Sequence, residues 1–240
     1  MRLQPGQAFR FDQFFPVYNW IYPASVFRSD ENIDAVAAIA QVSGIRSRAL
    51  YFHIPFCDTI CTFCPFVRGA GHSAETIAHY VDALIAEINF SGPALRDVPI
   101  AAIFFGGGTP SLLSPDQINQ IGRAIRENFD LSGLREFSFE FEIKSAKHEV
   151  MSAVREIGGT HARFGLQTFI PRYRKLFNLT STIDDIRRAA ADFKMLFPYV
   201  SSDLIFGMHG QSVNELLGDL EDWASLGLNN LDLYPINNVS

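Results

Sequence analysis

The sequence predicts an α/β fold in which a partial (β/α)6 barrel follows an N-terminal extension. Two observations lead to this prediction. From residue 49 onward, short apolar segments alternate with amphipathic segments, a pattern typical of βαβ units with a parallel sheet. Residues 1–48 differ, because aromatic residues and prolines are frequent in their first half. We therefore expect an N-terminal arm over 1–48, with a helix near 33–41, packed on a barrel core over 49–240.

Six segments are predicted as strands. The second is a continuous apolar run of the kind found in buried parallel strands, and the third alternates acidic and apolar residues at period two. The predicted strands cover residues 49–54, 100–105, 136–143, 162–169, 199–207 and 230–237. Six strands are fewer than the eight of a closed barrel, so we expect an open barrel with its ligand site at the C-terminal strand ends.

Five segments between these strands have apolar residues at helical spacing. They cover residues 74–90, 115–128, 150–157, 183–196 and 213–226. The second has the clearest start, because Ser114, Pro115 and Gln117 suit an N-cap, a first-turn proline and a capping-box partner. Helices in these places connect consecutive strands and complete the βαβ series.

Composition excludes several classes of protein. The chain of 240 residues carries a formal net charge of -6 and only 19% charged residues, which argues against a nucleic-acid binder. The N-terminal segment has no signal-peptide apolar stretch, and no run approaches 18 apolar residues. Three cysteines make a disulfide framework improbable. We expect a soluble cytoplasmic protein that binds neither membranes nor nucleic acids.

All three cysteines lie within eight residues, spaced C-x3-C-x2-C at Cys57, Cys61 and Cys64. A structural zinc site normally has four protein ligands, so zinc would need His53 or His72 as the fourth. A ferredoxin-type carrier uses four cysteines for each cluster. Three thiolates suit a four-iron cluster in which one iron stays open for a small ligand.

The segment YFHIPFCDTICTFC, residues 51–64, resembles the motif of radical S-adenosylmethionine (SAM) enzymes, in particular the oxygen-independent coproporphyrinogen III oxidase-like (HemN-like) branch. The resemblance implies a [4Fe-4S] cluster on the three cysteines, one or two bound SAM molecules, and cleavage of SAM to a 5′-deoxyadenosyl radical. It also implies a barrel of the radical SAM type, a small aromatic or tetrapyrrole-like substrate, and an electron donor such as flavodoxin or ferredoxin.

The resemblance extends to later strand ends and assigns a set of SAM-contacting residues. FFGGGTP resembles the family's glycine-rich motif, GLQTF its fourth strand, and SSDLIFGMHGQS its fifth. The assigned residues are Tyr51, Phe63, Gly107, Gly108, Thr109, Glu140, Gln167 and Asp203. Glu142 is expected on the same strand face as Glu140, and Phe56 and Phe66 are expected to pack beneath the cysteine loop.

Three departures from the family pattern bear on the reaction. Leu179 stands where many members have an arginine that contacts SAM, and His209 where most have proline. The usual C-terminal domain is expected to be absent from this chain. The missing arginine and the PINN segment over 235–238 favour C-methylation or cyclopropanation of an aromatic or tetrapyrrole-like substrate. The alternatives are oxidative decarboxylation of coproporphyrinogen III, anaerobic opening of haem, and a non-catalytic haem-carrying member of the branch.

Overall fold

The computed structural model describes residues 42 and 44–236. These residues lie within one compact unit that spans Ala35–Ser240. The expected arm over 1–48 and its helix near 33–41 lie almost wholly outside the described residues. Both therefore stay predictions.

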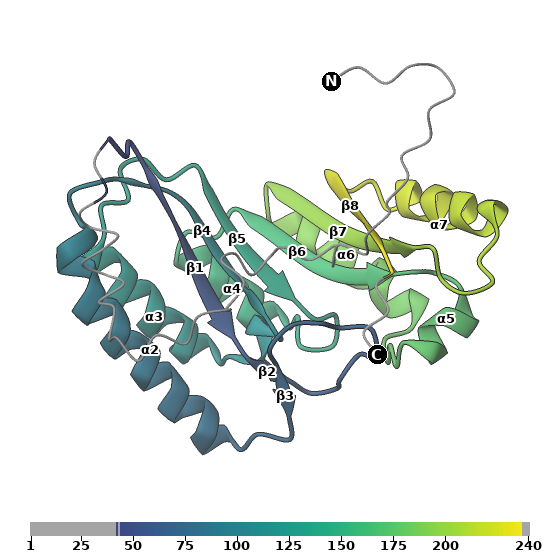
Figure 1. Ribbon diagram of the computed structural model, residues 1–240, viewed down its shortest axis with the longest axis horizontal. Coiled ribbons are helices and arrows are strands. Elements are labelled where there is room, and N and C mark those ends of the chain that lie inside the picture. Colours follow the sequence, from purple (N-terminus) through teal and green to yellow (C-terminus); the bar gives the residue numbers. More distant parts are fainter. Residues whose placement is uncertain (1–41, 43, 237–240) are drawn as a thin grey trace, which may run out of the picture. The chain divides into compact units, whose positions relative to one another are not determined.

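A parallel sheet of six strands forms the centre of the described region (Figure 1). Its strands follow one another in the order β1-β4-β5-β6-β7-β8. They are β1 (Arg48–Ile54), β4 (Ile100–Gly107), β5 (Glu136–Phe141), β6 (His161–Gln167), β7 (Tyr199–Phe206) and β8 (Asn230–Pro235). Each matches a predicted strand, although β5, β6 and β8 end two residues earlier than expected. Because every neighbouring pair is parallel, all six C-terminal ends lie at the same edge of the sheet.

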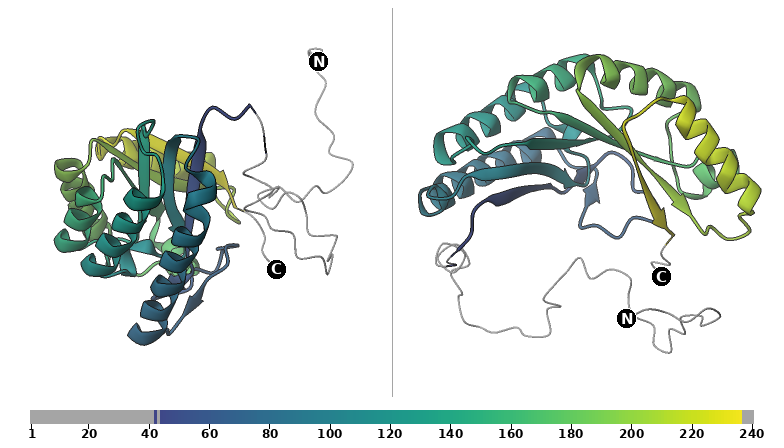
Figure 2. Two further views of the ribbon diagram at one scale, coloured as in Figure 1. Left: turned by 90° about the vertical axis from the view of Figure 1, so that its left-hand side faces the viewer. Right: turned by 90° about the horizontal axis from the view of Figure 1, so that it is seen from above.

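Helices cover the outer side of the curved sheet, as the view from above shows (Figure 2). They are α2 (Ala74–Leu95), α3 (Pro115–Asn128), α4 (His148–Glu156), α6 (Ile183–Leu196) and α7 (Val213–Ser225). The bounds of α3 and α6 equal the predicted ones, because capping boxes at Ser114 and Thr182 define where these helices begin. The result is the predicted open barrel of alternating strands and helices.

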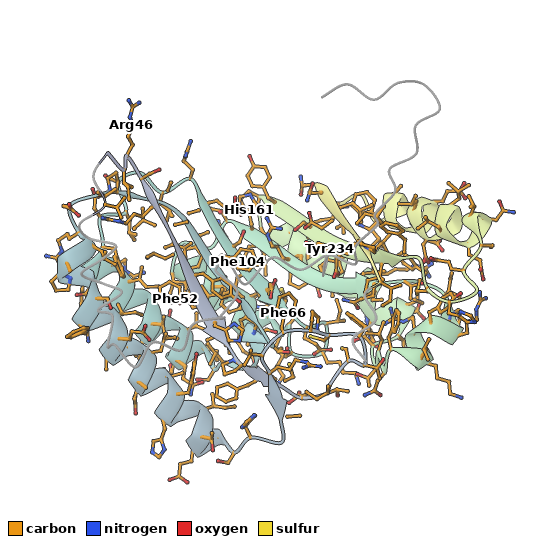
Figure 3. All side chains as sticks on the ribbon, viewed as in Figure 1. Arg46, Phe52, Phe66, Phe104, His161 and Tyr234 are labelled. Carbon is orange, nitrogen blue, oxygen red and sulfur yellow. The ribbon has the colours of Figure 1, made fainter. Side chains whose placement is uncertain are left out.

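The two faces of the sheet differ in chemistry because side chains alternate along each strand. Phe105, Phe137 and Phe139 are fully buried beneath the helices, and both Phe137 and Phe139 stack on Phe105. The opposite, inner face carries polar and aromatic side chains, including Phe104, His161 and Tyr234 (Figure 3). Hydrophobic packing therefore fixes the outer face, while the inner face is left for ligands.

Two short features were not predicted. β2 (Phe56–Cys57) pairs in parallel with β3 (Gly69–Ala70), and this pair closes the loop that holds the cysteines. The short helix α5 (Pro171–Leu176) follows β6. Both are too short to show a periodic pattern. In the described part of the chain, no helix is long and apolar enough to cross a membrane.

Candidate functional site

The cysteine loop lies at the C-terminal edge of the sheet, near Phe66 and opposite Arg46, which precedes β1 (Figure 3). Backbone and side-chain bonds tie this loop to the end of α5. The hydroxyl of Thr62 donates to the carbonyl of Leu176 at 2.9 Å, and Nδ2 of Asn178 donates to the carbonyl of Ile60 at 3.0 Å. Arg68 donates to the carbonyl of Phe66 inside the loop. These bonds hold the loop against the edge of the barrel.

The three cysteines are free thiols and half-buried. Burial, and then the neighbouring Cys64 and Cys57, raise the pKa of Cys61 to about 11. Burial also raises the pKa of Cys64. The thiols therefore stay neutral unless a positively charged group stabilises the thiolates, and an iron–sulfur cluster supplies such a group. The donor set fits a cluster held by three thiolates.

The histidines proposed as a fourth zinc ligand have other partners. Nδ1 of His53 lies 2.9 Å from the Tyr51 hydroxyl, and its Nε2 lies 2.8 Å from the carbonyl of Val67, so both ring nitrogens are engaged. The ring of His72 packs against the edge of Phe56. Within residues 42 and 44–236, no three His, Cys, Asp or Glu side chains form a preassembled metal site.

The glycine loop after β4 lies directly against the cysteine loop. The amide of Gly108 donates to the carbonyl of Ile54 at 2.7 Å, and the amide of Thr109 donates to the carbonyl of Phe56 at 2.6 Å. A Cβ at Gly108 would lie 2.6 Å from that Phe56 oxygen and 3.0 Å from Sγ of Cys57. Only glycine allows this approach, and it places the loop beside the first cysteine.

Two carboxylates lie close together on the inner face, Glu140 on β5 and Asp203 on β7. Burial and then the nearby Asp203 raise the pKa of Glu140 to about 7, although the Gly107 amide, which donates to it at 3.2 Å, opposes this. Burial raises the pKa of Asp203 to about 6, against the lowering effect of the Leu166 amide, which donates to it at 3.0 Å. Such a pair favours a cationic ligand, which would stabilise both charged forms.

Gln167 joins this pair from the end of β6. Its Nε2 lies 3.4 Å from both carboxylate oxygens of Asp203. A Cβ at Gly165 would lie 2.2 Å from that Nε2, so glycine there leaves room for the Gln167 side chain. The structure thus brings Glu140, Gln167 and Asp203 together from three strands.

Tyr51 and Phe63 are the two aromatic residues assigned to the SAM site. Tyr51 is 56% exposed, stacks on Phe104 of the inner face, and has a pKa raised to about 12 by partial burial and by Glu140. Phe63 packs on the ring of Phe177, in an apolar cluster that also contains Leu179. The position of the expected arginine is therefore part of an apolar wall.

Glu142 does not share the face of Glu140, because β5 ends at Phe141. Its carboxylate instead accepts hydrogen bonds from the amides of Lys144 and Ser145, at 3.0 and 3.1 Å, in the turn after the strand. The prediction of a shared face was therefore wrong. Two further expectations concern aromatic side chains: Phe56 is buried as expected, whereas Phe66 is 47% exposed and does not pack beneath the loop.

The sequence analysis missed Arg163, which lies on the inner face of β6. Its guanidinium forms ion pairs with Glu136 at 3.3 Å and Asp232 at 3.1 Å, and it lies 5.4 Å from the ring centre of Phe104. Counting back by twos from Gln167 through Gly165 places Arg163 on the same face, so strand alternation could have found it.

Comparison with known proteins places this geometry in a family. The model of the radical SAM superfamily matches residues 51–222. Anaerobilin synthase from Escherichia coli O157:H7 is 35% identical over 208 residues, which cover 84% of this chain and 46% of that protein. Heme chaperone HemW from Lactococcus lactis is 31% identical over 193 residues, which cover 80% of this chain and 49% of that protein. The chain spans about half the length of these relatives.

Among solved structures, coproporphyrinogen III oxidase (HemN) from Escherichia coli superposes with a TM-score of 0.79 and 25% identity, covering 88% of this chain and 49% of that one. This similarity confirms the predicted partial barrel. The matched region contains the three cysteines, the glycine loop and the three polar residues at the strand ends. Proteins of this family bind a [4Fe-4S] cluster and SAM. The chain belongs to the radical SAM superfamily, and its relatives include members of the HemN-like branch.

Proposed function

We propose that this chain is the catalytic core of a radical SAM enzyme that modifies a small aromatic or tetrapyrrole-like molecule. Cys57, Cys61 and Cys64 would hold the [4Fe-4S] cluster. When bound and reduced, the cluster supplies the electron that cleaves SAM to the 5′-deoxyadenosyl radical, which abstracts hydrogen from the substrate. A flavodoxin or ferredoxin is the proposed source of that electron.

The observation that carries the proposal is the pair of carboxylates, Glu140 and Asp203, at the strand ends near the cysteine loop. SAM carries a positively charged sulfonium and an amino group beside one carboxylate, so it is a cation overall, and two carboxylates whose charged forms burial disfavours are suited to receive a cation. The glycine loop connects the two halves of the site, because the amide of Gly107 donates to Glu140 while Gly108 lies against Cys57. We assign Gly107, Gly108, Thr109, Gln167, Tyr51 and Phe63 to the same SAM site.

The substrate class is supported by the inner face and by the named relatives. Phe104, with Arg163 over its ring, and the half-exposed Tyr51 and Tyr234 present flat aromatic surfaces. Two of the relatives, anaerobilin synthase and coproporphyrinogen III oxidase, carry tetrapyrrole names. Within this class we propose transfer of a one-carbon group, by C-methylation or cyclopropanation, with a second SAM as the carbon source. The apolar wall at Leu179 supports SAM binding that differs from the arginine-containing pattern.

A non-catalytic haem carrier is the second candidate, because HemW is among the relatives. The acidic pair beside the glycine loop suits a cationic ligand such as SAM, which favours the enzyme over the carrier. The two candidates differ in their optical spectra: a cluster gives a broad brown absorption, and bound haem gives a sharp Soret band.

The test is anaerobic reconstitution of the protein with iron and sulfide, followed by SAM and a strong reductant. Mass spectrometry should detect 5′-deoxyadenosine in the wild type and none in Cys61→Ala. S-adenosylhomocysteine in addition would support one-carbon transfer, and carbon dioxide from coproporphyrinogen III would support decarboxylation instead. A fully loaded cluster that yields no 5′-deoxyadenosine, together with stoichiometric haem binding, would favour the carrier.

A further inference from the structure

The turn that carries Gln167 has an unusual backbone. Gln167 has φ of 66°, in the left-handed region that side chains other than glycine rarely adopt. The pairing of β6 with β7 also shifts register between Gly165 and Gln167. A turn of this kind costs free energy and persists only where its surroundings hold it. The question is what holds it.

One answer is Asp219 on α7, which is only 2% exposed. Its carboxylate accepts hydrogen bonds from the Thr168 hydroxyl at 2.7 Å and from the Phe169 amide at 2.8 Å. Thr168 Oγ1 in turn accepts from the amide of Ile170 at 3.0 Å. A single buried carboxylate thus binds the two residues that follow Gln167.

The second answer is Arg174 at the end of α5, which is 8% exposed. Its Nη1 donates to the carbonyls of Leu166 and Thr168, at 3.0 and 2.8 Å, which are the residues on either side of Gln167. Its Nη2 donates to the carbonyl of Ser181 at 2.7 Å. Hydrogen bonds to a charged group are strong, so the guanidinium fixes both carbonyls of the turn.

These contacts determine where the Gln167 side chain points. Held in the left-handed conformation, Gln167 places its amide beside Asp203 of β7, and β7 leads directly into α7, which carries Asp219. The helix that follows one proposed SAM contact therefore holds the turn of another. The ends of β6 and β7 are therefore coupled through the hydrogen bonds of Asp219.

We propose that Asp219 and Arg174 are positioning residues that clamp the Gln167 turn and thereby set the SAM affinity of the site. Neither residue is assigned a contact with SAM. The inference rests on the proposed function for its SAM part, while the clamp itself is a property of the protein without ligand. A merely structural role would lower stability without acting through Gln167.

The clamp is tested first by hydrogen–deuterium exchange in the protein without SAM. In Asp219→Ala the Phe169 amide should exchange at least about ten-fold faster, since it loses the carboxylate that accepts its hydrogen bond. The control Glu221→Ala removes an exposed carboxylate from the same helix and should leave that amide unchanged. Unchanged exchange at Phe169 in Asp219→Ala would overturn the clamp.

The SAM part is tested by a double-mutant cycle on the cluster-loaded protein, with SAM affinity measured by calorimetry. Asp219→Ala should weaken SAM binding about ten-fold in the wild-type background and have no further effect in Gln167→Ala. Thr168→Val removes the hydroxyl that donates to Asp219 and should weaken SAM binding by a smaller factor, again only when Gln167 is present. This variant replaces Asp219→Ala in the cycle if Asp219→Ala folds poorly. Equal losses in both backgrounds would overturn the inference. Absence of SAM binding in the wild type would instead overturn the proposed function.

Discussion

Glu140 is expected to destabilise the protein without SAM at neutral and alkaline pH. Its carboxylate is partly buried beside Asp203, and its pKa rises from 4.5 to about 7, chiefly through burial. Glu140→Gln removes the charge but keeps an oxygen that can accept a hydrogen bond from the Gly107 amide, which donates to the Glu140 carboxylate at 3.2 Å in the wild type. The substitution therefore separates the cost of the charge from the value of the hydrogen bond.

The size and sign of the effect follow from proton linkage. Between pH 4.5 and about 7 the folded protein keeps a proton on Glu140 that the unfolded chain has released, so the free energy of unfolding falls as pH rises through this window. The full shift corresponds to about 3 kcal/mol, and the partial exposure of the side chain reduces this to about 2 to 3 kcal/mol. Below pH 4.5 Glu140 is protonated in both the folded and the unfolded state, so it no longer lowers the free energy of unfolding.

Urea unfolding of the protein without cluster or SAM measures the difference. Glu140→Gln should be more stable than the wild type by about 2 to 3 kcal/mol at pH 8 and by less than about 1 kcal/mol at pH 5. Glu221→Gln, which neutralises an exposed carboxylate on α7, should show no such dependence on pH. A Glu140→Gln protein that is equally stable or less stable at pH 8 would refute the reasoning.

Three further outcomes are expected from the same geometry. SAM affinity should rise about ten-fold from pH 6 to pH 8, as Glu140 with its pKa of about 7 becomes charged, and calorimetry in Glu140→Gln should show only the rise of about two-fold that Asp203, with its pKa of about 6, still contributes. Asp203→Asn should weaken SAM binding while iron and sulfide contents stay at wild-type levels; unchanged affinity would remove Asp203 from the site. Gly108→Ala should reduce cluster loading, because its Cβ would meet Sγ of Cys57 at 3.0 Å, whereas Gly218→Ala on α7, with open space around it, should not. Equal iron contents in the two variants would contradict this contact.

Much of the fold could be predicted because local and global signals agree in this sequence. The starts of α3 and α6 carry capping boxes, so their bounds follow from a few residues that satisfy free backbone amides. The strands were recognisable as apolar or alternating runs. Their parallel register then places Glu140 and Asp203 at one edge of the sheet, although the roles of these residues came from family resemblance rather than from pattern.

What could not be predicted depends on contacts between distant segments. The β2–β3 pair has two residues in each strand, too few for any periodic signal. Glu142 was misplaced because the alternating pattern continues past the point where β5 ends. Asp219 occupies a position three residues after Leu216 and four before Trp223, on the apolar side of α7. An acidic residue in such a stripe is a usable signal, but its partners lie about 50 residues away and only the fold identifies them.

The unliganded site combines two features that each cost stability. It contains two carboxylates whose charge burial disfavours, and a left-handed turn at Gln167. Each is of a kind that functional sites keep because a ligand compensates for it. A cluster favours the thiolate form, and a ligand with a positively charged sulfonium favours the charged form of both carboxylates. Because a ligand that binds only the folded state stabilises it increasingly as the ratio of free ligand concentration to Kd rises, cluster and SAM together should stabilise this barrel more than either does alone.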